Sequence, residues 1–218
     1  MINAIRYATL AAGLGLLTAP LAAQHDPDHA VAGGGTLPSG WHARTERNAP
    51  MDNVKFATMG NGFHVTLGPA AIFWRDSDTA NGNYHVVATF ARTKAPAHPE
   101  AYGLFIGGKN LGDSTQSYTY MIVRGNGEYS IWHREGYATR PTAIVPWTAH
   151  AAPAKADSAG KAQDELSVES RGGKVKFMVN GKEVHTADAS AVNPNGVVGY
   201  RVNHNLDVHL GAIGIHKM

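Results

Sequence analysis

The chain has 218 residues, of which 43% are hydrophobic and 17% charged, so it has enough apolar material for a core and too little charge for a disordered chain. Nineteen basic residues stand against seventeen acidic ones without a dense Lys/Arg block, and we therefore expect no nucleic-acid partner. The lack of cysteine excludes disulfides, thiolate metal sites and a cysteine nucleophile.

The N-terminal segment has the order of a secretory signal peptide. Arg6 precedes an apolar run from Ala8 to Ala23, and small residues end this run before the polar Gln24. The run is shorter than the roughly 20 apolar residues that a membrane-spanning helix needs. We expect residues 1–23 to be removed, leaving a periplasmic or secreted protein without a membrane span. A retained membrane anchor is the alternative.

The rest of the chain predicts a flexible leader followed by one β-domain. Residues 24–40 are rich in Gly, Pro and Asp, as linkers are. Apolar residues then alternate with polar ones in short segments separated by turn residues, which is typical of strands. The expected strands are 63–67, 84–90, 102–106, 117–124, 128–134, 166–169, 174–179, 183–186, 197–202 and 206–215. Residues 41–218 are thus predicted to be all-β, a two-sheet antiparallel jelly-roll sandwich.

Two hairpins can be placed in register from their turns. The turn Gly125-Asn126-Gly127 pairs Arg124 with Glu128. Because successive side chains alternate between faces, this hairpin has an apolar face and a mixed face. The apolar face carries Met121, Val123, Tyr129 and Ile131; the mixed face carries Tyr118, Tyr120, Arg124, Glu128, Ser130, Trp132 and Arg134.

The second hairpin turns at Gly172-Gly173. This turn pairs Val168 with Phe177 and Leu166 with Val179. Asn180-Gly181 is then a two-residue turn into a further strand.

These hairpins and their order resemble a known superfamily. DELSVESRGGKVKFMVNGKEV followed by NPNGVVGYRVNHNLDVHLGAIGI resembles the second half of concanavalin A-like domains, in particular laminin G-like and family 16 glycoside hydrolase-like members. YGLFIGG and YTYMIVRGNGEYSIWHREG are similar to the preceding strands. The resemblance covers about residues 41–217. It implies a concanavalin A-like jelly roll whose concave sheet binds a glycan, as it often does in this superfamily.

The catalytic motifs of related enzymes are not found in this sequence. Family 16 enzymes carry E-x-D-x-x-E, whereas Ser167 stands between Glu165 and Glu169 here. The 3-keto-disaccharide hydrolase-like domain is similar in outline, but its N-S-G and E-x-Q stretches are not recognisable. No catalytic residue is carried over, and three functions stay open: a carbohydrate-binding protein, a glycoside-processing hydrolase, and a structural or adhesive module.

The mixed face of the first hairpin is the candidate saccharide site. Trp132, Tyr120 and Tyr118 offer flat rings for sugars, and charged side chains offer hydrogen bonds to hydroxyl groups. The predicted ligand-binding residues are Tyr118, Tyr120, Arg124, Glu128, Trp132 and Arg134. The alternative is structural: a stabilising cross-strand pair of Tyr120 with Trp132, and an ion pair at the turn.

An oxygen-rich segment is the candidate metal site. Asp76, Asp78, Asn81 and Asn83 are closely spaced around an expected loop, and hard oxygen ligands of this kind hold structural Ca²⁺. The alternative is a solvated turn, which the same residue types also favour. No other cofactor is indicated, and the sequence does not indicate an oligomeric state.

Overall fold

The computed structural model describes residues 31–46 and 49–218. The expected signal peptide, residues 1–23, and residues 24–30 of the expected leader lie outside the described residues. In the part that is described, no helix is long and apolar enough to cross a membrane.

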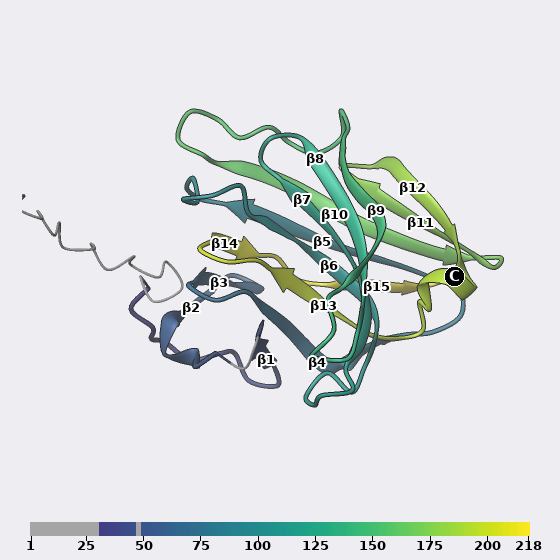
Figure 1. Cartoon of the computed structure of the whole chain (residues 1–218), viewed down its shortest axis with the longest axis horizontal. Helices are drawn as coiled ribbons and strands as arrows, with labels where there is room; N and C mark the ends of the chain where they lie inside the picture. The colour runs from purple at the N-terminus through teal and green to yellow at the C-terminus, as the bar shows by residue number, and fades with distance from the viewer. Residues whose placement is uncertain (1–30, 47–48) are drawn as a thin grey trace, which may run out of the picture.

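The strands form two antiparallel sheets packed face to face (Figure 1). The seven-stranded sheet has the order β1 (His42–Thr45), β4 (Ala71–Ala80), β13 (Gly196–Val202), β6 (Ala101–Lys109), β7 (Ser117–Arg124), β8 (Glu128–Glu135) and β9 (Thr142–Ala149). The eight-stranded sheet has the order β12 (Lys182–Asp188), β11 (Lys174–Val179), β10 (Ala162–Arg171), β5 (Tyr84–Arg92), β14 (Asp207–Leu210), β3 (Gly62–Leu67) and β2 (Val54–Met59), with β15 (Gly214–Lys217) also beside β5. The predicted two-sheet antiparallel jelly roll is confirmed.

The two helical segments with defined bounds are short. A 3-10 turn covers Met51–Asn53, and α1 covers Ala189–Val192. Neither has a buried face large enough to organise the domain, so the sheets alone build the core.

The main core lies between the two sheets. Inward side chains of both sheets interdigitate, and aromatic rings fill its centre: Phe63, Phe73, Phe90, Tyr102, Phe177 and Tyr200 are all buried. Phe90 of one sheet stacks on Tyr102 of the other, with ring centroids 5.5 Å apart. A shift of a strand by one residue would turn these rings from the core to the solvent, so their burial fixes the register of the strands.

Both predicted hairpin registers are confirmed. Arg124 pairs with Glu128, Met121 with Ile131, and Val168 with Phe177. Asn180 and Gly181 have φ angles of +50° and +73°, the left-handed backbone that a tight two-residue hairpin turn requires.

Several segments differ from the sequence predictions, and strands β1, β2 and β4 are among those that were not expected. The oxygen-rich loop prediction is wrong at its start, because Asp76 and Asp78 lie within strand β4. The single strand expected over 206–215 is two strands, β14 and β15, which pair with different parts of β5. Strand β9 was not predicted, and its Pro146 is tolerated because β9 is the edge of its sheet.

Part of the expected leader is paired with the domain. Gly33 donates a backbone hydrogen bond of 2.8 Å to Asp52, and Gly34 bridges to Lys55 of β2. A side chain at Gly33 would lie 2.1 Å from the Asp52 carbonyl oxygen, so only glycine permits this approach.

Candidate functional site

The outer face of the seven-stranded sheet carries a second apolar cluster, separate from the main core. We call it the outer cluster. Its buried members are Ile72, Trp74, Ala101, Phe105, Leu111, Tyr118, Tyr120 and Ile122, with Trp132, Trp147 and Val197 packed against them. The predicted mixed face of the first hairpin therefore points away from the sandwich core, as its register required.

The tyrosines of this face do not form the open platform that was expected. Tyr118 is 2% exposed and Tyr120 6% exposed, because neighbouring side chains cover both rings. Tyr118 packs against Phe105 with ring centroids 5.1 Å apart, and the Arg201 guanidinium lies over Tyr120 at 5.7 Å. Trp132 is half-buried opposite Tyr120, as the structural alternative predicted.

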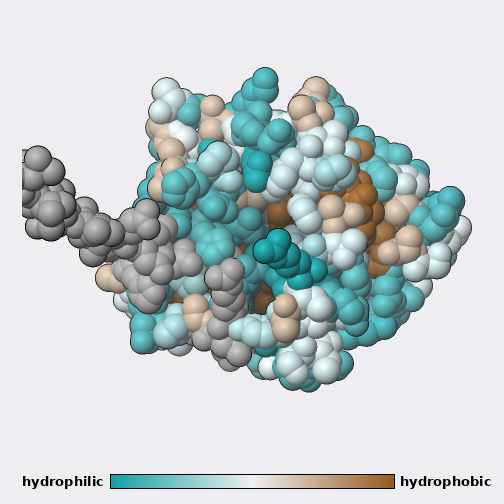
Figure 2. Space-filling model, viewed as in Figure 1, coloured by the Kyte–Doolittle hydropathy of each residue, from teal (hydrophilic) through white to brown (hydrophobic). Residues whose placement is uncertain are grey.

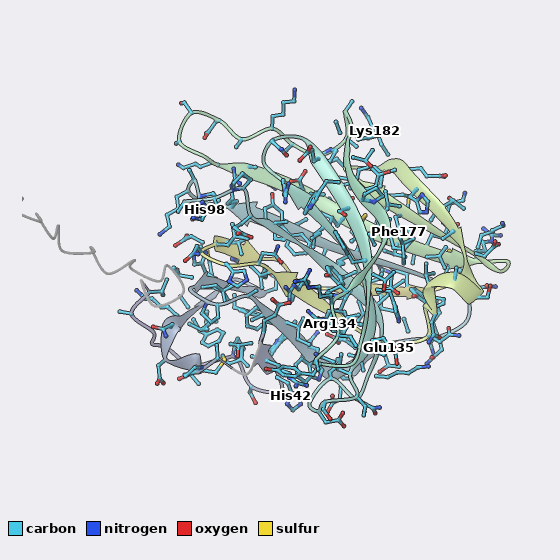
Figure 3. The ribbon with its side chains drawn as sticks, viewed as in Figure 1. His42, His98, Arg134, Glu135, Phe177 and Lys182 are labelled. Atoms are coloured by element: carbon cyan, nitrogen blue, oxygen red, sulfur yellow. The ribbon has the colours of Figure 1, made fainter. Side chains whose placement is uncertain are left out.

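A pocket of about 400 Å³ opens on this face beside the outer cluster. Its floor includes Ile72 and Tyr118, and its rim includes Tyr137 of the β8–β9 loop. Of the six predicted ligand-binding residues, Tyr118 and Arg134 line this pocket. Figure 3 shows Arg134 well inside the outline of the molecule, whereas His98 and Lys182 lie toward its margin.

The molecular surface is mostly hydrophilic on the face that Figure 2 shows. Hydrophobic residues gather in a few patches on this face.

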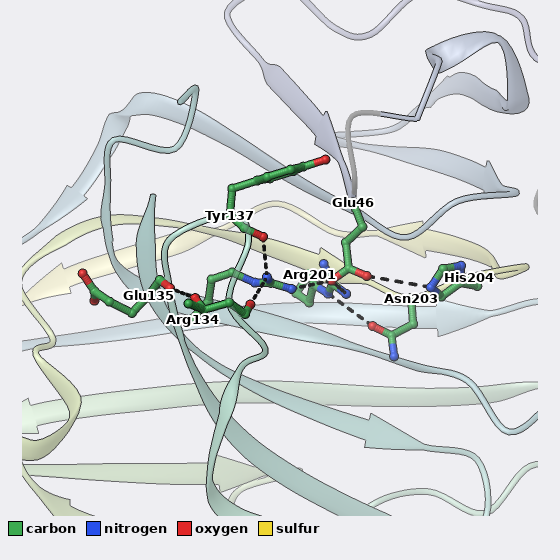
Figure 4. A network of polar contacts seen from close by, with 8 residues as sticks. Glu46, Arg134, Glu135, Tyr137, Arg201, Asn203 and His204 are labelled. Carbon is green, nitrogen blue, oxygen red and sulfur yellow. Dashed lines mark hydrogen bonds and ion pairs between the residues drawn. The ribbon is translucent and has the colours of Figure 1, made fainter. Parts of the chain in front are cut away.

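A buried charge network forms one wall of the pocket (Figure 4). The Glu46 Oε1 atom accepts from Arg201 Nη2 at 2.6 Å and from Arg134 Nη2 at 2.8 Å. Glu46 Oε2 lies 3.8 Å from His204 Nε2. Both arginine side chains are at least nine-tenths buried, so two buried guanidinium groups share one carboxylate.

Further hydrogen bonds hold these two arginines in place. Arg134 Nη1 donates to the backbone carbonyls of Thr139, at 3.1 Å, and Tyr137, at 3.4 Å. Arg201 Nε donates to Asn203 Oδ1 at 3.2 Å. The network therefore ties β8, β13 and the end of β1 to the loop that carries the pocket rim.

The network shifts the pKa of Glu46 and of Arg201. Burial alone would raise the pKa of Glu46, but the charges of Arg201 and Arg134 outweigh it and hold the pKa below its usual value. Burial would lower the pKa of Arg201, but Glu46 more than offsets it and raises the pKa. Burial raises the pKa of Tyr120 to about 12. At neutral pH Glu46 and Arg201 are thus ionised, and Tyr120 is neutral.

Arg124 and Glu128, also predicted as ligand-binding residues, lie at the hairpin turn and do not line the pocket. Arg124 Nη1 is 3.4 Å from Glu128 Oε2, the ion pair of the structural alternative. The Arg124 guanidinium also lies 3.5 Å from the ring centre of Trp147, an arrangement typical of cation–π contacts. Both residues have partners within the fold.

Three of the four predicted calcium ligands, Asp76, Asp78 and Asn83, have partners within the chain. Asp78 accepts from Arg75 Nε at 2.8 Å, and Asp76 accepts from Trp74 Nε1 at 3.2 Å. The Asn83 side chain accepts from the Gly172 amide. Among the described residues, no three or more His, Asp or Glu side chains gather as metal ligands would.

Glu46 and Arg201 were missed by the sequence analysis. The sequence could have indicated the orientation of Arg201: it stands between Tyr200 and Val202 of β13, which face the core, so its own side chain faces outward. Glu46 carries no such signal, because it follows a four-residue strand that the sequence did not predict.

Comparison with known proteins supports the fold. No protein-family model and no curated protein sequence matches this chain. Among solved structures, the carbohydrate-binding module CBM66 from Bacillus subtilis superposes with a TM-score of 0.60 at 13% identity, over 82% of this chain and 96% of that one. A family 16 endo-glucanase from Bacteroides ovatus superposes with a TM-score of 0.56 at 10% identity, over 83% and 96%.

A lumenal protein shares the same architecture. The exoplasmic/lumenal domain of VIP36, in a Ca²⁺/Man-bound form, superposes with a TM-score of 0.53 at 8% identity, over 82% of this chain and 83% of that one. With the two-sheet topology described above, these likenesses show that the chain has the concanavalin A-like jelly-roll fold. The resemblance inferred from the sequence is confirmed for the fold.

Proposed function

We propose that this protein is an exported carbohydrate-binding β-sandwich whose ligand occupies the pocket on the outer face of the seven-stranded sheet. The observation that carries the proposal is the pocket itself: about 400 Å³, bordered by tyrosines and by fixed hydrogen-bonding groups. Small-molecule sites combine such a volume with a few placed polar groups. The fold is shared with proteins whose names state carbohydrate binding.

The lining has the chemistry that a sugar needs. The half-exposed Tyr137 ring at the rim offers apolar surface to a sugar's C–H groups, as aromatic side chains do at binding sites. Gln116 and Thr139 offer neutral donors and acceptors to hydroxyl groups. Because the network around Glu46 holds Arg134 and Arg201 rigidly, little conformational entropy is lost when a ligand binds there.

The pocket favours binding over glycoside hydrolysis. Hydrolysis by the usual route needs two carboxylates about 5–9.5 Å apart. Among the described residues that line the pocket, Glu46 is the only carboxylate, and both of its neighbouring arginines keep it ionised. Glu128 and Glu135 lie on opposite faces of β8, since Glu135 accepts from Ser117 and Glu128 pairs with Arg124.

The hollow also argues against a purely structural or adhesive module. Such a module would be expected to have its outer face filled or flat, whereas this face has a pocket with charged walls. Removal of residues 1–23 would place the pocket in the periplasm or outside the cell, where saccharides are met. This part of the proposal depends on the order of residues in the N-terminal segment.

A glycan array with and without Ca²⁺, followed by calorimetry on each hit, tests the proposal. We expect a saccharide to bind, and we expect Tyr137→Ala to weaken binding at least about tenfold, the loss of one ring contact. Trp132→Ala is the matched control, because Trp132 lies on the same face but outside the pocket lining.

The outcomes separate the alternatives. No binding to any saccharide would overturn the proposal. A loss in Trp132→Ala with no loss in Tyr137→Ala would move the ligand to the open part of the first hairpin. A product released from a bound saccharide would favour the hydrolase, and dependence on Ca²⁺ would support the predicted calcium site.

A further inference from the structure

We infer that the pocket selects acidic saccharides, whose carboxylate or sulfate group is bound by the arginines at its rim. This inference rests on the proposed function and names the ligand class for that site. It depends on an imbalance of charge: four arginines line the pocket, Arg44, Arg134, Arg140 and Arg201, against the single carboxylate of Glu46.

Glu46 balances only part of this charge. Its Oε1 atom accepts from both Arg134 and Arg201, so its negative charge is already shared between two buried guanidinium groups. His204, 3.8 Å from the other oxygen, adds positive charge when it is protonated. Nothing in the lining balances Arg44 and Arg140.

Arg44 is positioned by neutral groups. Its Nη1 atom donates to the backbone carbonyls of Leu111, at 3.2 Å, and Asp113, and its guanidinium lies 4.9 Å from the Tyr137 ring centre. These contacts orient the group without neutralising it. The nearby Asp113 carboxylate is bound by Thr115 and is fully exposed, so water screens its effect on Arg44.

Arg140 is free to meet a ligand. It is exposed in the β8–β9 loop, and in the described part of the chain it has no hydrogen bond or ion pair. Arg44 and Arg140 thus leave guanidinium donors on the rim, above a base made rigid by Arg134 and Arg201. A planar guanidinium binds a carboxylate or sulfate through two parallel hydrogen bonds, which a neutral hydroxyl group cannot match.

Tyr137 places a ring beside these charges. With the Arg44 guanidinium on one face of the ring, the same rim offers a charged group and an aromatic surface. A sugar that bears an acidic group needs both, one for its ring and one for its charge. Neutral sugars would use the tyrosine and leave the guanidinium groups of Arg44 and Arg140 without an anionic partner in the pocket.

The test compares acidic saccharides with neutral counterparts that have the same sugar backbone. The probes are oligogalacturonate against its methyl ester, and dextran sulfate against dextran, measured by calorimetry on the full chain at about 0.05 and 0.5 M NaCl. We expect at least one acidic member to bind about tenfold tighter than its neutral partner, with affinity falling as salt rises. Oligogalacturonate alone binding identifies a carboxylate, and dextran sulfate alone identifies a sulfate group.

Variants assign the effect to the rim. Arg140→Gln is expected to weaken binding of the acidic saccharide about tenfold. The double variant Arg44→Gln/Arg140→Gln is expected to weaken it further. Arg171→Gln is the matched control, since Arg171 is exposed on the eight-stranded sheet, and it is expected to bind as the wild type does. Thermal melts of each variant confirm folding.

Three results overturn the inference and are distinguishable. If a neutral saccharide binds as tightly as its acidic partner and Tyr137→Ala weakens it, the inference fails and the proposed function stands. If no saccharide binds at all, both fail. Equal binding by wild type and the double variant would also refute a role for the rim arginines.

Discussion

Replacing Glu46 by glutamine should destabilise the protein, because Glu46 is the carboxylate partner of two buried arginines. Glutamine keeps the size of the side chain but removes the charge that balances Arg134 and Arg201. Those guanidinium groups are 10% and 6% exposed, so water cannot replace the lost partner. Removing one partner of a buried ion pair costs about 3–5 kcal/mol.

The structure favours the lower end of that range. The Glu46 side chain is 26% exposed, so some water reaches the network from the pocket side. We therefore expect Glu46→Gln to lower the free energy of unfolding by about 3 kcal/mol. For a domain of this size this corresponds to a melting temperature about 6–12 °C lower.

Urea denaturation followed by tryptophan fluorescence measures this effect. The midpoint should fall while the slope m stays unchanged, because the folded structure loses a charge and not its compactness. Glu135→Gln is the control: this side chain is 74% exposed, and its replacement is expected to leave the midpoint unchanged. Equal midpoints for the two variants would refute the view that Glu46 stabilises the site.

The pH dependence gives a second check on the same residue. The folded pKa of Glu46 is lowered, so its contribution to stability is fully present above its unfolded value of about 4.5 and is lost as the pH falls through the folded pKa. The difference between wild type and Glu46→Gln should therefore be largest at neutral pH and shrink under acid conditions. A difference that persists unchanged at about pH 3 would contradict this linkage.

Three further predictions concern stability. Asp164→Ala should lower the free energy of unfolding by about 3 kcal/mol or more in urea, because buried Asp164 accepts from Tyr102, Ala154 and Asn180; an effect below about 1 kcal/mol would argue against this. Gly181→Ala should cost about 1–2 kcal/mol, because φ is +73° at this turn; an unchanged melting temperature would contradict it. Burial, and then the charge of His64, lower the pKa of His209, so the free energy of unfolding should fall as the pH drops through about 6.5, where the histidine of the unfolded chain gains its proton. Between about pH 7.5 and 5.5 the melting temperature of His209→Gln should therefore fall less than that of the wild type, and equal falls would exclude this cause.

Local sequence was sufficient for the hairpins and for the fold class. In the first hairpin, Gly125-Asn126-Gly127 and the alternation on either side determine which residues face the core. The signal is strong because both the turn and the pairing lie within a few residues of one another, and a slip would expose Met121 or Ile131. The same reasoning placed Tyr118 and Arg134 on the outer face.

Local sequence was not sufficient for two features: the division of residues 206–215 into two strands that both pair with β5, and the edge strand β9, which contains a proline. Residues 206–215 alternate like one strand, yet the chain bends at Gly211, whose amide donates to Thr89 of β5 at 2.9 Å. Strand β9 contains a proline that argues against a strand unless the segment is known to lie at an edge. Both facts depend on neighbours that are distant in the sequence.

The sequence by itself therefore determined the strands, their turns and the side of the first hairpin that faces outward, because these follow from alternation over a few residues. Only the tertiary structure decided that this outward side is partly covered and that its pocket has charged walls. Glu46 is 155 residues from Arg201 and 88 from Arg134, and only the antiparallel sandwich brings the three together. The two buried guanidinium groups share the single carboxylate of Glu46, so Arg44 and Arg140 at the pocket rim have no carboxylate partner in its lining.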